Sequence, residues 1–273
     1  MKYLLTLTEY NLRAIRKPML WLLVLMGPAE AAVMLLGAQL WQGNLYAPFY
    51  TLFYFGMVIT ALCMITAAVL NFSVLLRQNG RSKAVYTMMT LPCCRSDLFW
   101  SGVISGALSV LAVMAAQALW YMILYLPVSY ANNAISAGLT KSIVETGITL
   151  PAGLDSLSAE NGLFLSMLRS PVMRLLFPMS GSGLLIMGTS ILCPVICLQS
   201  IACRRGFARV LHMVLFGICA FFMLIGLLYA FQSMFPGYVY GSAALNAFLP
   251  AQVVPAVICA VSALYGLAKA KNL

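Results

Sequence analysis

The chain offers few residues that could perform acid–base, nucleophilic or metal chemistry. Among 273 residues it has six Asp and Glu and a single histidine, His212, which leaves little material for general acid–base catalysis. The sequence contains no Gly-x-x-x-x-Gly-Lys-Ser/Thr loop, no His-Glu-x-x-His and no Gly-x-Ser-x-Gly. The usual sequence signals of a nucleotide-phosphate loop, a zinc-protease helix and a serine nucleophile are therefore missing. We expect no enzymatic activity, no catalytic residue and no cofactor.

One acid stands out by its position. Glu30 lies midway along an apolar run, in the sequence Gly27-Pro28-Ala29-Glu30. A carboxylate near the centre of a bilayer is costly unless it is protonated or paired inside the protein. Two interpretations stay open: a protonated acid hydrogen-bonded to a neighbouring helix, or an acid on a translocation path. The first is favoured, because one acid without a partner cation makes a poor relay.

The eight cysteines do not form a recognisable ligand set. Cys193 and Cys197 are four residues apart, so they share a helix face, but thiols in an apolar run usually serve as packing residues. His212 has no second histidine to complete a metal site. None of the cysteines falls in a predicted external loop, where a disulfide would persist. We expect no metal site.

Composition identifies the elements that must position these residues. The chain is 63% hydrophobic and 8% charged, whereas soluble domains carry about 25% charged residues, and its mean hydropathy is +0.96. Six apolar runs are long enough to cross a bilayer. They cover residues 18–41, 49–76, 98–126, 175–202, 209–231 and 246–268. The sequence predicts an all-α polytopic membrane protein with a single transmembrane domain over residues 1–273.

The net charge of +10 follows the predicted topology. With six spans, the Lys and Arg residues fall on one side of the membrane, except for Lys141, Arg169 and Arg174. Basic residues concentrate on the cytoplasmic side of membrane proteins. We therefore expect a protein of the cell membrane with both termini in the cytoplasm, and no binding of nucleic acid.

Residues 1–17 have the pattern of an interfacial helix. Apolar side chains can share one face and charged ones the other: Leu4, Leu5, Leu12 and Ile15 against Glu9, Arg13, Arg16 and Lys17. Such a helix lies in the plane of the membrane surface. The chain is then expected to turn inward at Pro18.

Tryptophans mark the expected ends of two spans. Trp21 and Trp41 bracket the first run, and Trp100 and Trp120 bracket the third. Twenty helical residues rise about 30 Å, which is the thickness of the hydrocarbon core. Because Trp is enriched at membrane interfaces, each pair is expected to mark both surfaces.

The third run opens with small residues four positions apart. Gly102 and Gly106 lie within Ser101-Gly102-Val103-Ile104-Ser105-Gly106-Ala107-Leu108-Ser109. Small residues at this spacing let helix backbones approach closely. We expect Gly102 and Gly106 to be helix-packing positions, within the chain or against a second copy.

A polar bridge from Arg77 to Trp100 separates the second and third runs. Gly80 and Ser82 are typical of a helix start, and Pro92 ends the helix near Leu91. About two turns remain, with apolar side chains on a segment too short to span a membrane. They are either a loop lying on the bilayer surface or a docking helix for a soluble partner. The candidate docking residues are Ser82, Lys83, Val85, Tyr86, Met88, Met89 and Leu91.

The bridge also carries a family resemblance. The run Tyr86-Thr87-Met88-Met89-Thr90-Leu91-Pro92-Cys93-Cys94-Arg95 resembles the Tyr-x-x-x-Thr-Leu-Pro-x-Ser/Cys-Arg pattern of the permease subunits of type-2 ABC exporters. The resemblance implies that residues 82–91 form the coupling helix that fits a cleft on a separate ABC ATPase. It also implies that the permease works as a pair, as a homodimer or a heterodimer, and that it exports its substrate.

Two alternatives remain. A secondary transporter or channel without an ATPase predicts ionisable residues in several spans, and Glu30 is the one candidate in the sequence. A membrane anchor or immunity-type protein would bind a partner without transport.

Overall fold

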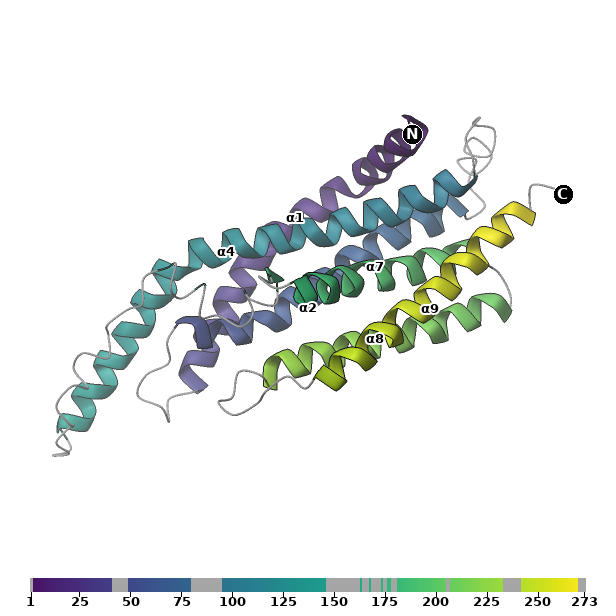
Figure 1. The fold of residues 1–273 in the computed structure, drawn as a ribbon. Helices are drawn as coiled ribbons and strands as arrows, with labels where there is room; N and C mark the ends of the chain where they lie inside the picture. The colour runs from purple at the N-terminus through teal and green to yellow at the C-terminus, as the bar shows by residue number, and fades with distance from the viewer. Residues whose placement is uncertain are drawn as a thin grey trace. The chain divides into compact units, whose positions relative to one another are not determined.

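The computed structural model describes six helices. Its described residues are 2–40, 49–79, 95–145, 181–204, 207–232 and 242–269, with Leu163, Met167, Met173, Leu176 and Phe177. The helices are α1 (Lys2–Leu40), α2 (Phe49–Asn79), α4 (Arg95–Glu145), α7 (Gly181–Cys203), α8 (Phe207–Gln232) and α9 (Ser242–Lys269) (Figure 1). These residues contain no strand. The all-α fold class is confirmed.

Four of the helices are long and apolar enough to cross a membrane. The stretches are Tyr3–Gly37, Ser96–Tyr130, Leu184–Cys203 and Leu249–Lys269, while α2 and α8 contain shorter apolar stretches at Val58–Ser73 and Phe207–Phe222. Every helix overlaps one of the predicted apolar runs. The number of six spans stays a prediction.

The chain divides into two compact units. Unit 1 comprises Met1–Trp21, Met64–Ala112 and Pro178–Leu273, and unit 2 comprises Leu22–Cys63 and Val113–Phe177. Helices α1, α2 and α4 contribute residues to both units, whereas α7, α8 and α9 belong to unit 1. The single transmembrane domain expected from the sequence stays a prediction.

One predicted helix boundary is wrong. Helix α1 has 39 residues and runs without interruption through Pro18, so residues 1–17 are not a separate helix. Helix α4 has 51 residues, contains the predicted run 98–126 and continues past Pro127 to Glu145. Proline is tolerated inside membrane helices because neighbouring groups satisfy the backbone atoms that it leaves unpaired.

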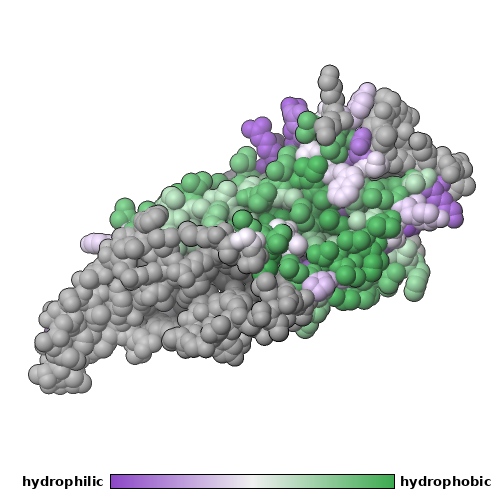
Figure 2. Space-filling model, in the orientation of Figure 1, coloured by the Kyte–Doolittle hydropathy of each residue, from purple (hydrophilic) through white to green (hydrophobic). Residues whose placement is uncertain are grey.

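Apolar residues cover most of the described surface in view (Figure 2). In unit 1, hydrophilic residues gather towards the end where the first turns of α1 and the last turns of α9 lie (Figures 1 and 2). The exposed Glu9 and Arg13 belong to these first turns and form an ion pair at 2.6 Å. A polar end next to an apolar surface is what a membrane environment favours.

The interior of unit 1 is built from two adjoining clusters. Phe99 and Val103 of α4 pack with Val195 of α7 and Ala263 of α9. The second cluster joins α7, α8 and α9 through cysteine and alanine side chains. Small residues in both clusters allow close helix packing, which membrane helices need because lipid is as apolar as leucine.

Candidate functional site

Glu30 of α1 is fully buried in unit 2, where it contacts side chains from α2 and α4. Its Oε1 accepts a hydrogen bond from Thr60 Oγ1 of α2 at 3.0 Å, and its Oε2 accepts one from Gln117 Nε2 of α4, also at 3.0 Å. Glu30 and Gln117 are 0% exposed and Thr60 is 3% exposed. The expected burial of Glu30 is confirmed, and its carboxyl group is held by hydrogen bonds from both neighbouring helices.

A glycine makes room for this side chain. A Cβ atom on Gly56 of α2 would lie 3.8 Å from Glu30 Cγ and Cδ and 3.2 Å from Met34 Cε. Met34 is itself fully buried. A Cβ at position 56 would be in ordinary van der Waals contact with Glu30 and would crowd Met34.

Trp120 also joins α4 to α1, about one helical turn after Gln117. Trp120 Nε1 of α4 donates to the backbone oxygen of Leu23 in α1 at 2.9 Å. The indole ring occupies the space into which a side chain on Gly27 would project. The sequence placed Trp120 at the membrane interface, but its polar N–H is used for helix packing within unit 2.

No cation balances Glu30 among the described residues. The ion pair found there is Arg13 with Glu9, in unit 1. The basic residue in the described part of unit 2 is Lys141, which lies 24 residues after Gln117 on α4, about 36 Å along a straight helix. The arrangement can therefore bind a proton or a small cation, and no described residue of unit 2 supplies a counter-charge.

Unit 1 has buried polar contacts of another kind. Asn71 Nδ2 of α2 donates to Ser109 Oγ of α4 at 2.7 Å, and Asn11 Nδ2 of α1 donates to Ser101 Oγ of α4 at 3.5 Å. All four side chains are buried. These pairs are neutral, so they join helices without the cost of burying a charge.

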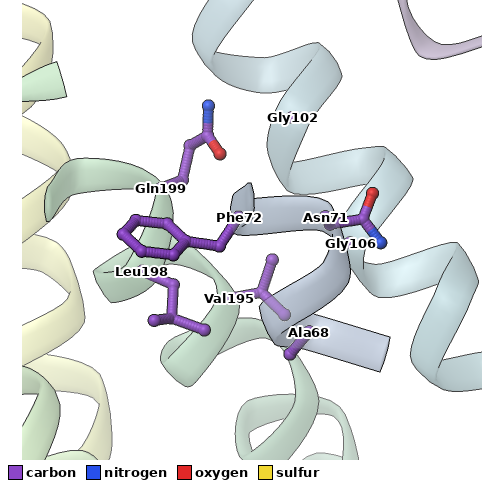
Figure 3. A pocket seen from close by; sticks show the side chains of 8 residues that line it. All are labelled: Ala68, Asn71, Phe72, Gly102, Gly106, Val195, Leu198 and Gln199. Carbon is purple, nitrogen blue, oxygen red and sulfur yellow. The ribbon is translucent and has the colours of Figure 1, made fainter. Parts of the chain in front are cut away.

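The two predicted packing glycines face α7. A side chain on Gly102 would collide with the Gln199 amide, and a Cβ on Gly106 would lie 2.7 Å from Val195 Cγ1. Both glycines border a pocket between α2, α4 and α7 (Figure 3), whose remaining lining is Ala68, Asn71, Phe72, Val195, Leu198 and Gln199. Its volume of about 10 Å³ accommodates at most one water molecule. The pocket reflects close helix packing and does not fit an organic substrate.

Four thiols meet in the core of unit 1. Cys193 and Cys197 of α7 pack with Cys219 of α8 and Cys259 of α9, and Cys197 Sγ lies 3.8 Å from Cys219 Sγ. In the part of the chain that the structure describes, no three His, Cys, Asp or Glu side chains are grouped to hold a metal ion. The thiols act as small apolar packing groups there.

The candidate docking residues lie outside the described residues, which end at Asn79 and resume at Arg95. Sequence reasoning also missed Thr60 and Gln117 as partners of Glu30. Their signal was available, because each is a polar side chain within an apolar run. What the sequence lacked was any indication that these positions and Glu30 come together.

Comparison of the chain with protein-family models, with curated proteins and with solved structures finds no match.

Proposed function

We propose that this chain is the membrane-spanning permease subunit of an ATP-driven exporter of the type-2 ABC class. ATP hydrolysis takes place on a separate ATPase chain, and two permease copies assemble in the cell membrane. The observation that carries the proposal is the Tyr86-to-Arg95 sequence, placed between two apolar helices. Four helices long enough to span a membrane support it.

The contacts on either side of the bridge suit a coupling segment. Helix α2 precedes the bridge and α4 follows it, and the Asn71–Ser109 bond joins the two helices in unit 1. The first turns of α1 are joined to α4 by Asn11 and Ser101. A push on residues 82–91 would therefore act on three connected helices together, as a transporter driven by a soluble ATPase requires.

The test is a double substitution in the bridge. Tyr86→Asp with Met89→Asp places two charges on the proposed contact surface, and charges in an apolar interface core oppose association. The tagged chain is purified from its native membrane, and the ATP hydrolysis that copurifies is measured. We expect wild type to carry this activity and the double variant to lose it, with unchanged membrane insertion.

The matched control is Tyr10→Asp. Tyr10 is 50% exposed on α1, so the change adds one charge of the same sign outside the bridge sequence. It should leave the copurifying ATPase activity in place. A double variant that retains full ATPase activity would contradict the coupling role and favour a transporter without an ATPase.

The proposed topology has its own measurement. Cys93 and Cys94 lie in the bridge, so a membrane-impermeant thiol reagent added to intact cells should not modify them. The same reagent should label them in inverted membrane vesicles. Labelling from outside the cell would reverse the assigned orientation.

A further inference from the structure

We propose that Glu30, Thr60 and Gln117 form a proton-binding site in unit 2, in which Glu30 carries an exchangeable proton. The ligand is a proton, and the groups that hold it come from α1, α2 and α4. This proposal goes beyond the permease function and does not depend on an ATPase partner.

The Thr60 hydroxyl group has one hydrogen and two possible acceptors. Its hydroxyl oxygen lies 3.0 Å from Glu30 Oε1 and 3.3 Å from the backbone oxygen of Gly56. The hydroxyl group has one hydrogen, so it can donate to one of these two acceptors. With an ionised Glu30, one of the two contacts has no hydrogen. Protonation of Glu30 reverses the direction of its bond with Thr60: the acid O–H then donates to Thr60 Oγ1, Thr60 donates to the Gly56 oxygen, and both contacts are hydrogen bonds.

The other carboxyl oxygen of Glu30, Oε2, is also paired in the protonated acid. Gln117 Nε2 donates to Glu30 Oε2, which a neutral acid accepts through its carbonyl oxygen. The three contacts together therefore fit a protonated carboxyl group. An ionised carboxylate without a counter-charge is costly inside a membrane, which also favours the protonated acid.

The other charged and titratable groups described in unit 2 do not supply a positive charge beside Glu30. The Cys63 thiol of α2 is close enough to Glu30 to interact with it electrostatically. The other charged residues in the described part of unit 2 are Lys141 and Glu145, near the end of α4. They are about 36 Å or more from Gln117 along the helix. Because no described residue of unit 2 places a cation beside Glu30, a proton is the positive charge that can neutralise its carboxylate.

An unused acceptor offers a place for proton exchange. Gln117 Oε1 is buried and has no hydrogen-bond partner among the described residues, although buried polar atoms are nearly always paired. A water molecule bound there would lie beside the carboxyl group. For exchange, the O–H group of Glu30 must first release Thr60 and turn towards that water. The O–H bond then breaks, its electron pair stays on the carboxylate, and the proton passes to the water to give hydronium. The reverse step restores the acid.

The test is infrared difference spectroscopy on the full chain in lipid at neutral pH. We expect the difference between wild type and Glu30→Gln to contain the carbonyl stretch of one protonated carboxylic acid, and this band should shift after transfer to D₂O. Glu145→Gln is the matched control, because Glu145 is exposed on α4 and should give carboxylate bands alone. Carboxylate bands for Glu30 would overturn the proposal. A Glu30 band that stays unshifted in D₂O would also overturn it, because the proton would not exchange.

A second measurement needs no variant. Dicyclohexylcarbodiimide is an apolar reagent that modifies protonated carboxyl groups within membranes, and the adduct is located by mass spectrometry. We expect one adduct per wild-type chain, on Glu30, with the same yield in K⁺ and Na⁺ buffers. An unmodified Glu30 would count against the site, and protection by Na⁺ at constant pH would identify a sodium site in its place. The carbodiimide adduct depends on Glu30 alone, whereas the copurifying ATPase activity tests residues 82–91, so this proposal and the permease proposal fail separately.

Discussion

The two units satisfy the hydrogen bonds of their buried polar side chains in different ways. Unit 1 joins its helices by neutral pairs, such as Asn71 with Ser109, and by glycines against α7. Unit 2 buries an acid between a hydroxyl and an amide. Neutral pairs can be satisfied permanently, because neither partner gains or loses charge near physiological pH. An acid can change its charge, so the Glu30 contacts in unit 2 depend on a proton, and the neutral pairs of unit 1 do not.

The largest expected effect comes from filling the close helix contacts. Gly102→Leu in unit 1 and Gly27→Leu in unit 2 would drive a side chain into Gln199 and into the Trp120 ring, respectively. Overpacking of this kind destabilises by about 1–3 kcal/mol, and sometimes by more. We expect both variants to lower the thermal unfolding midpoint in detergent.

Gly188→Leu is the control for both glycine variants. Among the described residues, no side chain or neighbouring helix lies within 4 Å of the position of a Cβ on Gly188, so the same leucine should leave the midpoint near that of wild type. If Gly102→Leu and Gly188→Leu unfold at the same temperature, the α4–α7 contact does not limit stability.

A smaller effect is expected for the loss of the Glu30 carboxyl group. Glu30→Ala leaves Gln117 Nε2 without its acceptor, and an orphaned buried donor costs about 1–3 kcal/mol. Glu30→Gln should be milder, because an amide reproduces a neutral acid: its NH₂ donates to Thr60 and its oxygen accepts from Gln117. The measurement is chemical unfolding of both variants at the same pH. Equal destabilisation by Ala and Gln would mean that these hydrogen bonds contribute nothing.

The smallest effect is expected for the neutral pairs. A double-mutant cycle with Asn71→Ala and Ser109→Ala isolates their interaction, and such hydrogen bonds between membrane helices average about 0.6 kcal/mol. The coupling energy should be the same at pH 5.5 and pH 8, because neither side chain titrates in this range. A pH-dependent coupling would remove the distinction between the two units.

Much of the fold could be predicted from the sequence. Long apolar runs must form helices in a membrane, because lipid cannot satisfy free backbone groups, and each helix found overlaps such a run. The sequence also indicated that Glu30 had to be buried, since an acid facing lipid is too costly. The glycines at 102 and 106 predicted a close helix contact, and a side chain at either position would collide with α7.

The tertiary structure alone decided which groups meet. Thr60 and Gln117 were polar residues in separate apolar runs, and nothing in the sequence indicated that they share Glu30 as a partner. Trp120 showed the spacing of an interface residue, yet Gly27 left room for its ring and Leu23 supplied an acceptor. Helix α1 continues through Pro18 and α4 through Pro127, against local preference. The physical reason is common to these cases: helix formation follows from each apolar run by itself, whereas partners depend on the rotation and register of helices that are distant in the chain.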